Sequence, residues 1–151
     1  MKIRLLDIND YEVMMDLWKR AGLSTMRPCG RDSRKAFARQ SNEDVALESN
    51  HGQQTVLGML RDDQLIGVVV ATHDGRKGWI NRLAIDPLHR RRGHAQQLIS
   101  AAEELLKMHG IQIVAALIKH ENAASLALFL RAGYHVHDDV YYLSKRDSNE
   151  A

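Results

Sequence analysis

The sequence predicts a mixed α+β fold, in which helices cover both faces of a central, mostly antiparallel sheet in a three-layer α/β/α arrangement. Residues 53–60, 64–73 and 78–87 form strand-like apolar runs separated by short polar turns, which predicts an antiparallel meander. A helical pattern connects the third run to another apolar run at 111–118. Such a strand–helix–strand crossover predicts that these two strands are parallel.

The N-terminal third is predicted to form a strand and two helices. Residues 2–8 alternate as a short strand. Asn9 and Glu12 have the spacing of a capping box, and apolar residues then recur at helical spacing until Gly22 ends the run. The polar run at 34–47 has a thin apolar face, so we expect a second helix at the surface.

The C-terminal half is predicted to contain two helices and two or three strands. Apolar residues from Leu98 to Leu106 mark one face of an amphipathic helix that Gly110 ends. The run at 111–118 is nearly all apolar, which is typical of a strand covered on both faces. Residues 122–133 have a helical pattern, and residues 134–146 are expected to form one or two closing strands.

Length and composition indicate one globular domain, which we expect at residues 1–146 with a frayed tail at 147–151. A net charge of +2 argues against nucleic acid as the main partner. The single cysteine excludes an intrachain disulfide, and no Cys/His spacing indicates a metal site. We see no signal peptide and no stretch that could span a membrane, so we expect no membrane partner and a cytoplasmic location.

Three arginines and a glycine, Arg90–Gly93, lie between the third strand and the following helix. A helix N-terminus presents unpaired N–H groups and partial positive charge, and Gly93 and Ala95 keep the approach open to an anion. A solvated charge cluster is the alternative. The strand-to-helix position favours a phosphate-binding loop.

Neither GxxxxGK[ST] nor GxGxxG is present, so the common nucleotide-binding loops do not apply. The sequence "RRRGHA" instead matches [QR]-x-x-G-x-[GA], the acetyl-CoA signature of the GNAT superfamily of N-acetyltransferases. Downstream, "NAASLALFLRAGY" resembles a second element of that family at Asn122, Ser125, Leu128, Arg131, Gly133 and Tyr134. The two elements, in this order around a helix and a strand, extend the resemblance over nearly the whole chain.

The resemblance implies a GNAT fold in which the parallel strands splay apart at the acetyl-CoA site. Acetyl-CoA would be the acyl-donor substrate, with no metal. Its pantetheine would run beside a strand, and its pyrophosphate would lie on the loop. The implied cofactor-binding residues are Leu83, Ala84, Ile85, Arg90, Arg91, Arg92, Gly93, His94, Ala95, Gln96 and Asn122. Asn122 is also a good helix cap, and both roles are compatible.

The resemblance implies direct acetyl transfer to a primary amine in a ternary complex, with the N–H of Ile85 or Leu83 polarising the thioester carbonyl. The family's usual tyrosine proton donor is replaced by Phe129, and its usual glutamate before Asn122 is absent. Tyr141 or Tyr142 could donate the proton instead. Strand alternation would allow at most one to reach the cleft, and a packing role is the alternative for each.

The acceptor is open between a small-molecule amine and a peptide or protein amine. Basic residues at 27–34 would suit an acceptor with a carboxylate, or form a basic surface loop. Cys29 has no nearby base, which favours a partly buried thiol over a nucleophile. A catalytically weak CoA-binding module and, less favoured, a nucleic-acid-binding domain are the alternative functions. A homodimer through a sheet edge is a further expectation.

Overall fold

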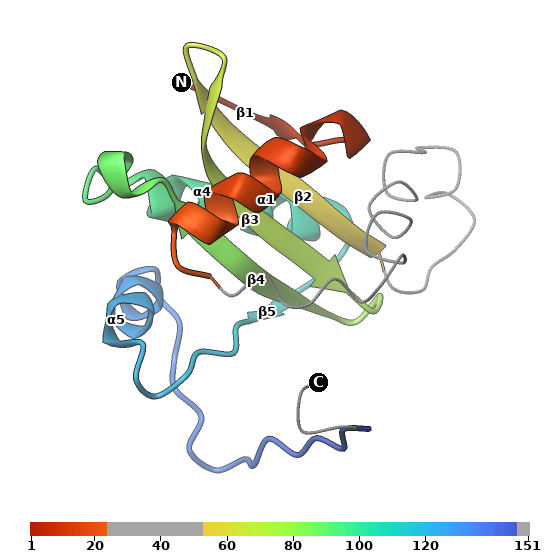
Figure 1. Ribbon diagram of the computed structural model, residues 1–151. Helices are drawn as coiled ribbons and strands as arrows, with labels where there is room; N and C mark the ends of the chain where they lie inside the picture. Colours follow the sequence, from red (N-terminus) through yellow and green to blue (C-terminus); the bar gives the residue numbers. More distant parts are fainter. Residues whose placement is uncertain (24–52, 148–151) are drawn as a thin grey trace.

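The computed structural model describes residues 1–23 and 53–147, and its centre is a five-stranded sheet in the order β1-β2-β3-β4-β5 (Figure 1). Neighbouring strands are antiparallel except for the parallel pair β4–β5. The predicted mixed α+β fold is therefore confirmed. Along the chain the elements are β1 (Lys2–Leu5), η1 (Ile8–Asp10), α1 (Tyr11–Arg20), β2 (Gln53–Arg61), β3 (Gln64–His73), β4 (Lys77–Ile85), η2 (Pro87–His89), α4 (His94–Met108), β5 (Ile113–Ala115) and α5 (Ala123–Arg131).

Helices α1 and α4 cover opposite faces of the sheet (Figure 1). Strand β3 supplies both cores by simple alternation: Val68 and Val70 pack with α1, and Val69 and Ala71 pack with α4. This explains why β3 is apolar without interruption, since a strand covered on both faces needs no polar face. The apolar faces of the two helices fill the outer layers, with Met14, Leu17 and Trp18 from α1 and Leu98, Ile99, Ala102 and Leu106 from α4.

Two strand glycines let α4 lie close to the sheet. A Cβ at Gly67 would stand 2.9 Å from Cδ1 of Leu98, near the start of the helix. A Cβ at Gly78 would stand 2.8 Å from Cδ1 of Leu106, near its end. Both distances are too short for real carbon atoms. The absence of a side chain at each glycine thus leaves room for the leucine side chains of α4.

Strand β4 contains a bulge and outruns its parallel partner. Val68 pairs with Ala84 and Val70 with Asn81, so two residues of β4, Arg82 and Leu83, oppose one residue of β3. Arg82 takes the left-handed conformation, with φ 49°. Pairing with β5 covers only Lys77↔Ile113 to Trp79↔Ala115. Beyond Trp79, β4 continues to Ile85 with no pairing to β5, which fits the splay that the resemblance implies.

The predicted capping box at Asn9 and Glu12 is wrong. Asp7 accepts a hydrogen bond from the N–H of Asn9 at 2.8 Å, and the side chain of Asp10 accepts one from the N–H of Asp7 at 2.9 Å. The box forms two residues earlier because a 3-10 turn, η1, precedes α1. Aspartate thus fills both positions of the box.

The C-terminal strands differ most from the prediction. Only Ile113–Ala115 of the run at 111–118 forms a strand, and Ile113 and Leu117 are each 60% exposed, so the expectation of cover on both faces is wrong. Residues 134–146, predicted to form one or two closing strands, have no strand. A strand needs a partner for its backbone groups, and apolar alternation alone does not supply one.

The predicted helix at 34–47 and residues 148–151 of the predicted tail lie outside the described residues. Within the described ranges, none of the helices has the length and apolar character needed to cross a membrane.

Candidate active site

The loop between β4 and α4 is built by a buried aspartate and a short turn. Asp86 is 2% exposed and accepts a hydrogen bond from the N–H of Leu88 at 2.9 Å, which starts η2. Pro87 ends β4 because it has no N–H for the ladder. Arg91 and Gly93 then take left-handed conformations, with φ 62° and 80°. These two residues turn the chain sharply into α4.

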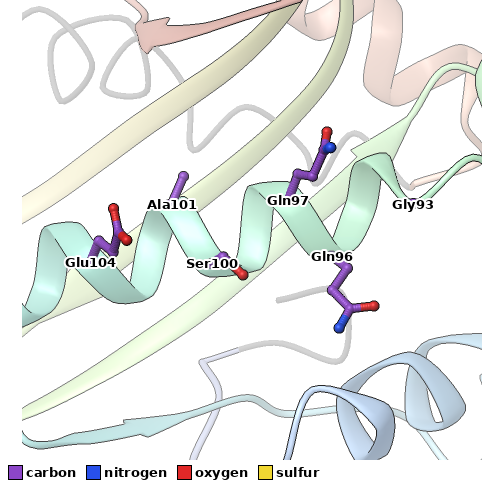
Figure 2. Close-up of a pocket in the computed structure, with 6 residues that line it drawn as sticks. All are labelled: Gly93, Gln96, Gln97, Ser100, Ala101 and Glu104. Carbon is purple, nitrogen blue, oxygen red and sulfur yellow. The ribbon is translucent and has the colours of Figure 1, made fainter.

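The N-terminus of α4 is open. Its N-cap, Gly93, makes no side-chain capping hydrogen bond, and no heavy atom lies within 4 Å of where its Cβ would stand. A shallow hollow of about 430 Å³ follows this end of the helix (Figure 2), lined by Gly93, Gln96, Gln97, Ser100, Ala101 and Glu104. Figure 2 shows Gln96 and Gln97 projecting from opposite sides of the first turns. Exposed N–H groups beside open space at the positive end of a long helix suit an anion.

The arginines of the loop divide into two kinds. Arg90 donates from Nη2 to the carbonyl of Ala21 at 3.1 Å and from Nε to the carbonyl of Ile85 at 3.4 Å. Its guanidinium therefore connects two parts of the protein. Arg91 and Arg92 are exposed, so their side chains as well as their backbone N–H groups can meet an anion.

His94 lies in the core. It is 5% exposed, and neither ring nitrogen has a hydrogen-bond partner among the described residues. Only its backbone can therefore contribute to the loop surface. Sequence reasoning missed this burial, because position 94 falls between two small residues of a loop motif.

The outer edge of β4 leads to this helix end. The N–H of Asp86 donates to the carbonyl of Ile66 in β3 at 2.7 Å. Because backbone groups alternate in direction along a strand, the N–H of Ile85 points to the opposite edge, where β5 no longer pairs. Leu83 lies in the bulge, and its side chain and that of Ile85 pack on the α4 face, whereas Ala84 packs on the α1 face.

Asn122 caps α5. Its side-chain oxygen accepts a hydrogen bond from the N–H of Ser125 at 3.1 Å, and the residue is exposed. The helix-cap role of Asn122 is confirmed. The side-chain amide group remains as a donor facing solvent, so the predicted contact with the cofactor stays a prediction.

Phe129, at the position of the family's usual tyrosine, belongs to the core. It is 6% exposed and packs edge to face against Tyr134, with ring centroids 5.0 Å apart. Burial and the neighbouring charge of Glu103 raise the pKa of the Tyr134 hydroxyl well above its usual value. Burial also raises the pKa of Glu103. Sequence reasoning missed the pair Tyr134 and Glu103, because these residues lie in different parts of the chain and only the fold brings them together.

The two tyrosines predicted as proton donors are exposed. Tyr141 is 94% exposed and Tyr142 is 70% exposed, on a segment without regular secondary structure. Neither lines the hollow at the start of α4, nor a larger cavity of about 650 Å³ between the β4–β5 pair, α5 and residues 132–140. Their catalytic role stays a prediction.

Polar and aromatic side chains of β4 outside the loop make local contacts. Nδ2 of Asn81 donates to Oγ1 of Thr72 at 3.2 Å, and Nζ of Lys77 lies 4.7 Å from the ring centroid of Trp79. Cys29 and the basic residues at 27–34 lie outside the described residues. Among the residues that the structure describes, no three His, Cys, Asp or Glu side chains gather as a metal site.

The chain is similar in sequence and in fold to known acetyltransferases. The acetyltransferase SG1711 of Sodalis glossinidius is 27% identical over 146 residues, covering 97% of this chain and 95% of that protein. The aminoglycoside N-acetyltransferase AAC(6')-Iy, solved with a CoA-based bisubstrate analogue, superimposes with a TM-score of 0.71 at 20% identity, covering 96% of this chain and 97% of that one. The PaiA N-acetyltransferase of Thermoplasma acidophilum, solved with coenzyme A, gives 0.66 at 19% identity, covering 93% and 94%. Residues 14–134 match the acetyltransferase (GNAT) family. This match spans most of the chain and both motif elements, and the chain therefore belongs to the GNAT acetyltransferase family.

Proposed function

We propose that this acetyltransferase transfers an acetyl group from acetyl-CoA directly to a primary amine in a ternary complex. The observation that carries the proposal is the uncapped N-terminus of α4 at Gly93, which follows the unpaired edge of β4 at Leu83–Ile85. A pyrophosphate needs N–H donors and positive potential, and a pantetheine arm needs a free strand edge. The two features adjoin in this order.

The phosphate-binding cradle, residues 91–96, would bind mainly through backbone N–H groups. We assign the pyrophosphate to the N–H groups of residues 91–96, with the exposed Arg91 and Arg92 adding charge. Arg90 contributes by fixing the loop to the carbonyls of Ile85 and Ala21. The side-chain amide of Asn122 would donate to the cofactor arm while its oxygen caps α5.

Acetyl-CoA supplies a thioester that a neutral amine can attack. The N–H of Ile85, on the open edge of β4, would donate to the thioester oxygen and stabilise the charge that develops there. The N–H of Leu83 is the alternative donor. Tyr141 or Tyr142 would give a proton to the departing thiolate, and water would do so if neither tyrosine does.

The acceptor is proposed to be a small-molecule amine, with a peptide or protein amine as the alternative. Two proteins whose solved structures are similar to this chain, AAC(6')-Iy and HMB0005, are aminoglycoside acetyltransferases by name. An assay of thiol release from acetyl-CoA across a panel of aminoglycosides, polyamines, amino acids and peptides tests this choice. Faster release with peptides than with small amines would overturn it.

A matched pair of glycines tests the cradle. Gly93 and Gly110 both have φ 80°, and at neither residue does a heavy atom lie within 4 Å of where a Cβ would stand. Alanine at either residue costs about 1 kcal/mol of backbone strain. Only Gly93→Ala should weaken acetyl-CoA binding, by about tenfold or more in a calorimetric titration. Equal affinities for the two variants, or no binding by the wild-type protein at high micromolar acetyl-CoA, would contradict the proposal.

A catalytically weak CoA-binding module is the second candidate. It is favoured by the buried Phe129 at the usual tyrosine position and by the exposure of Tyr141 and Tyr142. Binding of acetyl-CoA without amine-dependent thiol release would support this candidate against the enzyme.

Three wider expectations also remain proposals: one domain over residues 1–146, a cytoplasmic location, and a homodimer through a sheet edge. The exposed side chains of Ile113 and Leu117 near β5 support the last. Light scattering after gel filtration would detect the dimer, and a monomer at every concentration tested would exclude it.

A further inference from the structure

The last turn of α1 contacts the segment that would bind the acyl donor at three places. Nε1 of Trp18 donates to the carbonyl of Arg82 at 3.1 Å. Arg20 forms an ion pair with Asp86, and the carbonyl of Ala21 accepts from Arg90. Each contact joins two residues more than sixty positions apart in the sequence. Together the contacts cover the stretch from the bulge of β4 to the loop before α4.

The first contact lies at a strained residue. Arg82 is left-handed, with φ 49°, within a strand, a conformation that a residue with a side chain adopts only when its surroundings enforce it. Trp18 contacts both ends of this residue, because its indole N–H binds the Arg82 carbonyl and its ring lies 4.4 Å from the guanidinium carbon. Trp18 is itself 6% exposed in the α1 core. The tryptophan therefore fixes the backbone just before Leu83–Ile85.

The second contact lies at a buried charge. Asp86 is 2% exposed, and the Leu88 N–H and the Arg20 guanidinium satisfy its carboxylate. Arg20 also donates to Asp16, an exposed residue one helical turn earlier in α1, at 2.9 Å. Asp86 sets the turn of η2, so Arg20 holds the start of the loop.

We propose that Trp18 and Arg20 are positioning residues for acetyl transfer, which act as a clamp on the strand and loop that bind acetyl-CoA. Trp18 holds the bulge so that the N–H groups after it face the donor, and Arg20 holds Asp86 so that the loop meets the start of α4. This inference rests on the proposed function. It assigns neither residue a contact with the substrates.

Trp18→Phe tests the first contact because it keeps the ring and removes the N–H donor. We expect acetyl-CoA affinity to fall about tenfold and amide hydrogen exchange at Leu83–Ile85 to become faster. Adding Arg82→Gly should restore both, since glycine adopts φ 49° without strain and needs no clamp. The melting temperature should stay low in the double variant, because the contacts between Trp18 and Arg82 remain lost. A role in stability alone would not separate affinity from melting temperature in this way.

Arg20→Gln tests the second contact, with Arg20→Lys and Asp16→Asn as controls. We expect acetyl-CoA affinity to fall several-fold in the glutamine variant, to recover partly with lysine, and to stay unchanged in Asp16→Asn. All titrations are made well below the unfolding temperature of each variant. This pair also tests the clamp if Trp18→Phe does not fold.

The clamp is overturned if Trp18→Phe binds acetyl-CoA as the wild type does, if Arg82→Gly fails to restore a weakened Trp18→Phe, or if Arg20→Gln and Asp16→Asn behave alike. Failure of the wild-type protein to bind acetyl-CoA would refute the proposed function instead. Hydrogen exchange at Leu83–Ile85 in the free protein would still test the clamp in that case.

Discussion

The two parallel strands of the sheet have very different surroundings. In β4, Ile80 is 3% exposed and Ile85 is 8% exposed, and contacts from α1 continue past the end of the strand. In β5, only three residues are paired, and Ile113 is 60% exposed. Where β4 and β5 splay apart, β4 is therefore supported by packing in two cores. Strand β5 has little support from packing.

This difference separates two parts of the proposed reaction. Donor binding would depend on backbone N–H groups in β4, the loop and α4, and these elements pack against the two cores. Proton donation would depend on Tyr141 or Tyr142, which follow β5 and α5 on an exposed segment. The donor site is therefore the better defined of the two.

The largest expected effect compares packing on the two sides. Leu98 is fully buried beside Gly67 at the start of α4. Leu98→Ala should lower the free energy of unfolding by about 3 kcal/mol, because it leaves a cavity in the core. Ile113→Ala, at a 60% exposed side chain, should cost about 1 kcal/mol or less. Urea denaturation measures both. Equal costs would mean that β5 is covered in solution and would break the comparison.

The next effect concerns the charge at the end of β4. Burial works to raise the pKa of Asp86, but the Leu88 N–H and Arg20 outweigh it and hold the pKa below its usual value. Its contribution to stability is therefore complete above about pH 5 and is lost as the pH falls through about 4 and below. Asp86→Asn should cost about 2 kcal/mol at pH 7.

The cost of Asp86→Asn should shrink toward zero in acid, where the wild-type carboxyl group is protonated and therefore neutral like asparagine. Urea midpoints between pH 3 and pH 7 follow this change. Asp16→Asn removes the exposed partner of Arg20 and should cost less than about 0.5 kcal/mol at every pH. A pH-independent cost for Asp86→Asn would mean that the charge of Asp86 does not stabilise the loop.

A smaller effect separates the two roles of Asn122. Asn122→Ala should cost about 1 kcal/mol of stability, because the N–H of Ser125 loses its partner. Asn122→Asp keeps the capping oxygen and should leave stability nearly unchanged. Both variants lack the side-chain N–H, so both should raise KM for acetyl-CoA. A normal KM for acetyl-CoA in Asn122→Asp would mean that Asn122 only caps α5 and does not bind the donor.

The smallest effect on stability is expected on the exposed segment. Tyr141→Phe and Tyr142→Phe should each change the free energy of unfolding by less than about 0.5 kcal/mol. One of them should lower turnover while acetyl-CoA affinity stays unchanged, as measured by thiol release and calorimetry. Normal turnover in both would show that solvent protonates the thiolate.

Local signals predicted much of the fold. The predicted strand at 64–73 agrees with β3 to the residue, because polar turns bound it on both sides. The helix before Gly110 and the junction at Gly93 follow from glycine at positions with φ 80°. These features depend on neighbours in sequence, so a pattern is sufficient to find them.

Features that depend on distant partners could not be predicted. The pairs Trp18–Arg82 and Arg20–Asp86 join residues in different elements, and nothing near either residue indicates the other. The buried ring of His94 looked like part of a polar loop for the same reason. The closing strands expected at 134–146 would need a partner strand within reach, and the local sequence does not show whether one is present.

Helix α4 packs closely on Gly67 and Gly78, so a shift at one end of the helix would also move its other end. About 12 Å of helix separates Leu98 from Leu106 at 1.5 Å per residue. A side chain at Gly78 that lifted the far end by about 1 Å would tilt the helix by about 5° around Leu98. The opposite end, where the N–H groups of the cradle lie, would then move by about 0.5 Å. Substitutions far from the donor could thus alter its affinity without touching the loop.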